Sequence, residues 1–377
     1  MPSGKSAAAL DSVPLRSRVY RFLYASEDFC SRQSLARECK ISMPTLYQNL
    51  TDLMDAGLVR YSGESQFTGG RKAQGLEIVP DARIAVGIAV SGHRLRLVAT
   101  DLRLRELACR SLPFELFALL SGGSGVLAEI LEDFLNDYQI NRDRLLGVGL
   151  TIPGLLTPDH SRILMVPTLG LTKQPVALLT SGIPYPVYVE NDGTASGRAE
   201  GFARRAYENL AYLSLESGVG GCLLINGAPF YGDQYRSAEF GHICIHPGGR
   251  KCGCGRHGCL EAYCSANRIL EDTGVSLEDF FLGLQSHVPE YETLWYDMLR
   301  NLAVGITTIR MIVDCKVVLG GFLMEYLSPW LPVLKKYVQA NDPFDKTADY
   351  IEESVLRQNA APLGAALHFV DDFVRSI

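Results

Sequence analysis

The chain has 377 residues, of which 47% are hydrophobic and 21% charged, and its net charge is −6 at pH 7. These fractions are those of an ordinary globular protein and exclude a disordered or fibrous chain. Because a single hydrophobic core stops growing near roughly 250–300 residues, we expect more than one domain. No stretch approaches the roughly 18 apolar residues of a membrane-spanning helix, and residues 1–18 lack the apolar segment of a signal peptide. We therefore expect a cytoplasmic protein without a membrane partner.

Charge is distributed unevenly along the chain. Residues 1–80 carry ten Lys and Arg against eight Asp and Glu, a net charge of +2, which leaves −8 for the remainder. The first segment therefore approaches an anionic partner more easily than the rest. A mixed-charge solvated surface gives the same count, so both interpretations stay open.

Residues 31–57 are typical of two short helices joined by a tight turn. Ser31 and Ser42 are suited to cap the first and the second helix, and Pro44 falls in the first turn of the second, where its missing N–H costs nothing. Gly57 is placed to end that helix. An earlier helix and the second one each carry one apolar stripe. The stripes comprise Leu15, Val19, Phe22 and Leu23, and Leu46, Leu50, Leu53 and Met54.

The segments 58–63 and 75–80 resemble two strands flanking a polar loop, which is the pattern of a wing. Three helices followed by a two-stranded wing describe a winged helix-turn-helix, whose second helix enters a major groove. A small helical protein-interaction module is the alternative; the tight turn, the wing and a basic pair in its loop favour double-stranded DNA. Base contacts are expected from the polar face of the second helix, and phosphate or minor-groove contacts from the loop. The expected DNA-binding residues are Thr45, Tyr47, Gln48 and Asn49, together with Arg71 and Lys72 beside Gly69 and Gly70.

From Arg83 onward, strands and helices alternate. Three consecutive strands precede a helix and a buried strand, and a second strand-rich start follows, so we expect two similar halves and an α/β fold. A helix with an apolar face closes the chain. The expected strands are 83–90, 94–101, 105–112, 145–154 and two within 210–227, and the expected helices are 126–138 and 361–374.

Several motifs in this part carry a resemblance to a known family. The segment AEFGHICIHPGGRKCGCGRHGCLE at 238–261 is similar to the paired signatures of the ROK family, which groups bacterial sugar kinases with sugar-responsive repressors. VENDGTASGRAEG at 189–201, LTIPGLL at 150–156 and LESGVGGCLLING at 215–227 fit the same family in order and spacing. The cysteine-rich motif is highly specific, whereas the glycine motifs alone are weak.

The resemblance covers nearly all of residues 80–377 and implies an actin-like, two-lobed sugar kinase fold, which is ribonuclease H-like. A winged helix in front is typical of the family's repressor branch. The expected division is a winged helix-turn-helix domain over 1–80, a first lobe over 81–190 that the C-terminal helix 358–377 joins, and a second lobe with a zinc loop over 191–357.

The ten cysteines of a cytoplasmic chain are expected to be buried small hydrophobes or metal ligands rather than a disulfide framework. Cys252, Cys254 and Cys259 with His242 supply three thiolates and one imidazole, a closed tetrahedral set suited to structural zinc. The alternatives are a reduced, metal-free cluster and a regulatory disulfide. We interpret the remaining cysteines of this region, Cys244 and Cys264, as packing residues.

The resemblance also implies a sugar site, since carboxylates and an amide make directional hydrogen bonds to vicinal hydroxyls. One ring nitrogen of His242 would bind zinc while the other contacts the sugar. Two of the acidic residues, Glu239 and Glu261, are alternatively ordinary surface acids. The expected sugar-binding residues are Gly154, Asn191, Asp192, Glu239, His242 and Glu261.

The kinase pattern breaks in this chain. The family's early phosphate loop, D-x-G-G-T, is replaced by GIAVSGHR at 87–94, with Ala89, Ser91 and His93 at the aspartate, first glycine and threonine. The lost carboxylate no longer helps to organise Mg²⁺, so ATP and Mg²⁺ are not expected as cofactors. Three further departures affect the phosphate side and the sugar side. They are Glu216 beside the expected phosphates, Phe322 in place of a third glycine, and Thr168 and Leu171 where sugar kinases often have Asn and Trp.

We therefore expect a DNA-binding transcription regulator, a repressor that senses a sugar or sugar derivative and acts as a homo-oligomer, either a homodimer or a dimer of dimers. Lobe closure around the ligand would change the spacing of two winged helices and with it operator binding. One alternative is an active ATP-dependent sugar kinase in which Asp192 is the general base. Another is a sensor that a protein partner controls.

Overall fold

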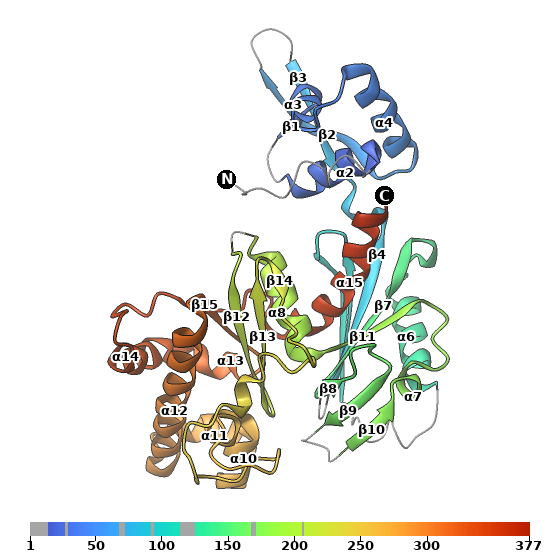
Figure 1. Cartoon of the computed structure of the whole chain (residues 1–377). Helices are drawn as coiled ribbons and strands as arrows, with labels where there is room; N and C mark the ends of the chain where they lie inside the picture. Colours follow the sequence, from blue (N-terminus) through green and yellow to red (C-terminus); the bar gives the residue numbers. More distant parts are fainter. Residues whose placement is uncertain are drawn as a thin grey trace.

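The computed structural model describes residues 14–26, 29–67, 72–91, 94–113, 125–166, 171–205 and 207–377. Figure 1 shows a small N-terminal unit in blue above two larger units that lie side by side. In the described ranges, none of the helices combines the length and the apolar character needed to cross a bilayer.

In its described residues, the small unit contains three helices and a three-stranded sheet of order β1-β3-β2. Ser31 caps α3 in a capping box with Ser34, and the Ser42 hydroxyl accepts from the Thr45 N–H at the start of α4, so both predicted caps are confirmed. The wing prediction was incomplete, because β1 adds a third strand and pairs antiparallel with β3. The elements are α2 (Leu15–Ala25), β1 (Cys30–Ser31), α3 (Arg32–Glu38), α4 (Met43–Asp55), β2 (Val59–Phe67) and β3 (Lys72–Ile78).

The first large sheet has five strands in the order β11-β7-β4-β5-β6. β4, β5 and β6 form an antiparallel meander, whereas β7 runs parallel to both β4 and β11. Helix α6 covers one face with Leu127, Leu131 and Phe134 in a common core. The elements are β4 (Ile84–Val90), β5 (Arg94–Asp101), β6 (Glu106–Pro113), α6 (Val126–Asp137), β7 (Leu145–Ile152) and β11 (Val187–Asn191).

A small antiparallel sheet of order β10-β9-β8 follows β7 and was not predicted. Its first strand begins directly after Gly154, and Figure 1 shows the small sheet below the first large sheet. The elements are β8 (Leu155–Leu156), β9 (Arg162–Val166), β10 (Leu171–Pro175) and the short helix α7 (Ala177–Thr180).

The second large sheet also has five strands, in the order β14-β13-β12-β15-β16. Its largest core lies between the sheet and the helices that follow it, and Trp295, Phe280 and Leu299 are fully buried there. The strands are β12 (Leu210–Leu215), β13 (Val219–Ile225), β14 (Ala228–Pro229), β15 (Lys316–Gly320) and β16 (Ile351–Glu353). The helices are α9 (Glu261–Cys264), α10 (Ala266–Thr273), α11 (Leu277–Gln285), α12 (Pro289–Val313), α13 (Met324–Leu327) and α14 (Leu331–Asn341).

Two helices lie between the large sheets. α8 (Asp192–Ala203) packs on β12 and β13 of the second sheet, and α15 (Ala360–Ser376) packs on β4 and β7 of the first. The two helices also pack against each other, so each sheet contacts the other through this pair (Figure 1).

The C-terminal end of α15 reaches the small N-terminal unit. Buried residues of α2, of the β5–β6 turn and of α15 form one continuous apolar core. The Ser17 hydroxyl donates to the Ile377 carbonyl, and the Tyr24 hydroxyl donates to the Leu102 carbonyl at 2.8 Å. The N-terminal unit therefore packs on a surface formed by α15 and the β5–β6 turn.

Candidate functional site

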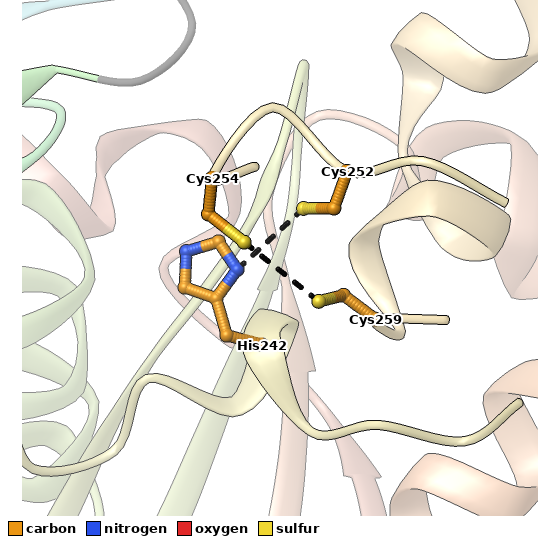
Figure 2. A group of neighbouring side chains, drawn as sticks. All are labelled: His242, Cys252, Cys254 and Cys259. Atoms are coloured by element: carbon orange, nitrogen blue, oxygen red, sulfur yellow. Dashed lines mark hydrogen bonds between the residues drawn. The ribbon is translucent and has the colours of Figure 1, made fainter. Parts of the chain in front are cut away.

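Four side chains from the loop after β14 converge on one point. His242 ends a short 3₁₀ helix, and Cys252, Cys254 and Cys259 follow in the next loop. Their ligand atoms all lie within 4.8 Å of one another, and Figure 2 shows the four side chains pointing inward.

The spacing of these atoms tests whether zinc fits. His242 Nδ1 lies 3.7 Å from Cys252 Sγ, and Cys254 Sγ lies 3.8 Å from Cys259 Sγ. A tetrahedral site with metal–sulfur bonds of about 2.3 Å has ligand–ligand separations of about 3.6–3.8 Å. The donor set and these two separations therefore fit one tetrahedral ion.

The backbone holds the loop in place independently of a metal. The Cys252 N–H donates to the Arg256 carbonyl at 2.8 Å, and Cys244 forms an isolated bridge with Cys259. Cys264 is fully buried, as expected for a packing residue. Cys244 is exposed, so its interpretation as a packing residue was wrong; its Sγ faces the His257 carbonyl at 3.7 Å.

Beside this cluster lies a cleft with a volume of about 280 Å³. It opens where the ends of β7 and β11 in the first sheet meet the start of β13 in the second. All the residues predicted to bind a sugar line it: Gly154, Asn191, Asp192, Glu239, His242 and Glu261. The structure thus brings together residues that lie up to 107 positions apart in the sequence.

Asn191 organises the floor of the cleft. Its side-chain oxygen accepts from the Thr194 N–H at 2.9 Å and caps α8, and its side-chain nitrogen donates to the Gly154 carbonyl at 2.9 Å. Gly154 has φ +106°, and a Cβ there would lie 2.3 Å from the Met165 carbonyl oxygen, so only glycine fits. Both amide atoms of Asn191 are engaged, which makes it a positioning residue as well as a lining residue.

His242 connects the cysteine cluster to the cleft. Its Nε2 lies 3.9 Å from Glu239 Oε2, whereas its Nδ1 faces Cys252. Glu261 makes a similar connection, because one oxygen accepts from the Val219 N–H at 3.0 Å and the other faces Cys252 Sγ at 3.6 Å. An ordered arrangement of the cysteine cluster therefore also fixes the orientation of the His242 and Glu261 side chains, which line the cleft.

The cleft is strongly acidic. Burial raises the pKa of Asp192 to about 6. Burial and the nearby Asp192 raise the pKa of Glu216 to about 8, and burial with Asp192 and Glu261 raises that of Glu239 to about 7. Arg236 supplies the one arginine or lysine side chain among the described residues that line the cleft. Neutral polar ligands are therefore favoured over anionic ones.

The degenerate phosphate loop lies at the edge of this cleft. Ser91 lines the cleft and its hydroxyl donates to the Arg94 carbonyl at 3.2 Å, while Ala89 belongs to β4 and is not among the lining residues. Glu216 lines the cleft as well, together with Gly218, Gly220 and Gly221. His93 and Thr168 lie outside the described residues.

The predicted DNA-binding residues on α4 divide into two groups. Tyr47 and Gln48 are exposed, and Gln48 Nε2 donates to Asp52 Oδ1 at 3.1 Å. Thr45 and Asn49 are half-buried, and the Asn49 side chain donates to the Thr45 carbonyl at 2.7 Å.

In the wing, Arg71 lies outside the described residues, and Lys72 is the first residue of β3. Arg32, the first residue of α3, was not among the predicted residues. Its guanidinium carbon lies 5.2 Å from the ring centre of Tyr47 on α4 and 5.8 Å from that of Tyr61 on β2. Such cation–π contacts join the second helix to the wing. The sequence feature that could have indicated Arg32 is its position as a basic residue directly after the Ser31 cap.

Two family models match the chain: the ROK family over residues 85–371 and a helix-turn-helix domain over residues 10–62. The xylose repressor of Bacillus subtilis (strain 168) is 25% identical over 366 residues, which cover 92% of each chain. The crystal structure of a ROK family transcriptional regulator, a homologue of the E. coli MLC protein, superposes with a TM-score of 0.74 at 21% identity and covers 96% of each chain. That of the ROK hexokinase from Thermus thermophilus gives 0.61 at 26% identity, over 78% of this chain and 100% of the other. The predicted fold class is confirmed, and the chain belongs to the ROK family and carries a helix-turn-helix domain in front of its ROK region.

Proposed function

We propose that this protein is a sugar-responsive DNA-binding transcription regulator, a repressor of genes for carbohydrate use. The observation that carries the proposal is the continuous core of α2 and α15, since α15 also packs along α8, whose first residue, Asp192, lines the cleft. A xylose repressor that matches over 92% of both chains supports it.

A structural zinc ion is part of this proposal. Cys252, Cys254, Cys259 and His242 Nδ1 would hold it, and four protein ligands leave no open position for catalysis. When bound, the ion supplies a rigid tetrahedral crosslink that orders the loop. The His242 ring is then fixed with Nε2 toward Glu239 and the cleft.

The sugar would act by changing the placement of the winged helix. The cleft receives residues from both large sheets, so a ligand that contacts both favours one relative arrangement of the two lobes, 81–190 with 358–377 and 191–357. In a homodimer, half-sites must lie one helical turn or a multiple apart, and a small rotation prevents simultaneous engagement. Ligand binding and operator binding are thereby coupled.

The experiment has two steps. Binding sites are first selected from random duplex DNA, and gel-shift affinity for the selected operator is then measured with a panel of neutral sugars, amino sugars and sugar phosphates. We expect one sugar class to lower operator affinity at least tenfold. Failure to enrich any sequence, or an affinity that is constant across the whole panel, would contradict the DNA or the sensing part respectively.

Two variants separate the functions. Asp192→Asn is expected to lose the sugar response and keep operator affinity, because Asp192 lines the cleft and not the DNA-binding unit. Gln48→Ala is expected to weaken operator binding and keep the thermal shift that the sugar produces, because Gln48 is exposed on α4. A variant that loses both responses while its melting temperature is unchanged would contradict this separation.

A second candidate function is an ATP-dependent sugar kinase. The observation that favours it is Asp192, which lines the cleft with a pKa raised to about 6 by burial, a value suited to a general base. A thermal shift with Mg-ATP and sugar turnover that Asp192→Asn abolishes would support it. A shift with sugar and none with Mg-ATP would favour the regulator.

A further inference from the structure

A segment that follows the second large sheet along the chain contacts the first large sheet. It comprises residues 230–238, directly after β14, and we call it the strap. The Tyr231 hydroxyl donates to Glu190 Oε2 on β11 at 3.0 Å. The ring of Tyr235 meets the ring of His160, in the turn between β8 and β9, edge-on with centres 5.9 Å apart. Because β14 and β11 belong to different large sheets, the strap joins the two lobes (Figure 1).

The strap also borders the cleft, and its backbone is strained. Arg236, within the strap, and Glu239, directly after it, line the cleft. Tyr235 and Ala238 have φ +55° and +60°, in the left-handed region that residues with a side chain adopt only at an energetic cost. Such a conformation persists only while the surrounding contacts hold it. The strap therefore has a relaxed alternative, which it can adopt when its contacts with the first lobe are lost.

Glu190 connects the strap to the rest of the first lobe. This residue is 3% exposed, and its Oε1 accepts from the Asn191 N–H at 2.9 Å. Its Oε2 accepts from Tyr231 and also from the Tyr188 hydroxyl, the latter at 2.9 Å. Burial and the nearby carboxylate raise the pKa of both tyrosines, so both hydroxyls stay protonated and donate. A movement of Tyr231 therefore changes the hydrogen bonding of the oxygen that Tyr188 shares.

Two contacts lead from this carboxylate to α15. The ring of Tyr188 stacks on that of His368 of α15, with centres 3.6 Å apart and planes at 5°. Arg198 of α8 interacts electrostatically with Glu190, and its guanidinium donates to Asp371 Oδ2 of α15 at 3.1 Å. The C-terminal end of α15 packs under the winged helix. The strap is thereby connected to the DNA-binding unit.

We propose that the strap is a latch between the two lobes that holds α15 in place, an inference that rests on the proposed coupling of the cleft to the winged helix. While the Tyr231 hydroxyl is bonded to Glu190, the carboxylate fixes Tyr188 and, through its ring, His368. When the lobes separate, Tyr231 withdraws with the second sheet, Glu190 loses a donor and α15 is held less firmly. Glu190 and Tyr231 are thus positioning residues, because both act on the winged helix through other groups.

Hydrogen–deuterium exchange of the full chain, prepared with zinc, tests the latch without ligand or DNA. Tyr231→Phe removes the hydroxyl that joins the lobes and keeps the ring, so exchange in peptides from the strap and from α15 should rise about threefold or more. Tyr185→Phe is the matched control, because the Tyr185 hydroxyl donates to Glu132 at 2.8 Å within the first lobe. It should leave exchange in α15 unchanged. Peptides from α14 are the internal reference for a general loss of stability.

Ala238→Gly should act in the opposite direction. Glycine adopts the left-handed φ of this position without the cost that alanine bears, so the latched form is favoured. Exchange in the strap and in α15 should therefore fall below that of the parent protein. This variant also decides the question if Tyr231→Phe does not fold.

Two substitutions of His368 test the route to α15. His368→Ala removes the stacked ring and should raise exchange in α15, whereas His368→Phe keeps an aromatic ring and should restore the exchange of the parent protein. Both variants remove the contact of His368 Nε2 with Asp372 Oδ2 at 3.4 Å. A rescue by phenylalanine therefore assigns the effect to the stack with Tyr188.

Operator affinity gives a second readout and separates the two proposals. Tyr231→Phe and His368→Ala should shift the gel-shift affinity for the selected operator in one direction, and Ala238→Gly in the other. Exchange in α15 that Tyr231→Phe leaves unchanged, or a shift of the same sign for Tyr231→Phe and Ala238→Gly, overturns the latch and leaves the regulator intact. Failure to select any operator overturns the DNA-binding part of the proposed function, whereas the exchange measurements still decide the latch.

Discussion

Gly364 of α15 lies directly against the backbone of Ala195 of α8: a Cβ on Gly364 would fall 1.8 Å from the Ala195 carbonyl oxygen. On its other side α15 meets Gly87 of β4, where a Cβ would fall 1.7 Å from the Pro362 carbonyl oxygen. The helix is thus held closely between α8 and the first sheet. Because α8 begins at the cleft and α15 ends under the winged helix, this packing joins the two sites.

Gly364→Ala should destabilise the protein, because the neighbours of the new Cβ are backbone atoms that cannot turn away. Overpacking of this kind typically costs about 1–3 kcal/mol of unfolding free energy. The measurement is urea denaturation of the variant. Gly63→Ala is the control, since a Cβ on Gly63 meets nothing within 4 Å. Equal unfolding free energies of the two variants would contradict the close packing of α8 against α15.

Cys254→Ser should lower the zinc content from the expected value of about one ion per chain to near zero. Three remaining ligands leave the tetrahedral set incomplete, and the melting temperature should fall by several degrees because the loop loses its crosslink. Elemental analysis and thermal unfolding measure the two effects. Cys244→Ser is the matched control, as Cys244 is exposed and outside the cluster. Full zinc content in Cys254→Ser would refute the ligand set.

Stability should fall with rising pH because of Glu216. Burial and Asp192 raise the folded-state pKa of Glu216 from 4.5 to about 8, so between these values the folded chain keeps a proton that the unfolded chain releases. This contribution to stability is complete at low pH and is lost as the pH rises through about 8. Asp192, with its pKa raised by burial to about 6, acts in the same direction at lower pH.

Glu216→Gln tests this reasoning, since glutamine does not ionise. Its melting temperature should match that of the parent protein near pH 5 and exceed it near pH 8.5, whereas Glu271→Gln, an exposed site on α10, should show no such trend. If the difference in melting temperature between Glu216→Gln and the parent protein stayed constant across this pH range, the raised pKa of Glu216 would be contradicted.

Arg32→Ala should weaken operator binding about tenfold. The substitution removes the cation that lies between Tyr47 of α4 and Tyr61 of β2, and with it the contact that aligns the second helix with the wing. Arg37→Ala, on the same helix and paired with Glu38, is the control and should change affinity less than twofold. Salt titrations distinguish alignment from a direct phosphate contact, because the latter lowers the salt slope by about 1.

The sequence predicted those parts of the structure that depend on local chemistry. The caps at Ser31 and Ser42, the meander of β4 to β6 and the closing helix follow from capping residues and from apolar periodicity. The cluster of three cysteines and one histidine followed from ligand type and spacing, since Cys252, Cys254 and Cys259 are close in sequence. The sugar residues came from a family resemblance and all line one cleft.

What the sequence did not predict depends on contacts between distant residues. β1 has two residues and exists because it pairs with Leu76 and Gly75 of β3, some 45 positions away. Asn191 was expected to face a sugar, but the structure engages its amide with Thr194 and Gly154. The Tyr231 hydroxyl, beyond β14, donates to Glu190 Oε2 of β11, and no periodicity in the sequence indicates this contact.

The shared core beneath the winged helix has a consequence for domain exchange between regulators of this kind. A chimera that transplants residues up to about 80 carries α2 but leaves behind the apolar surface on which α2 packs. Val370 and Val374 of the last helix and Ile377 directly after it contribute to this surface. A foreign DNA-binding unit would then meet an apolar surface shaped for another partner. Functional hybrids should therefore take both ends of the chain from one parent.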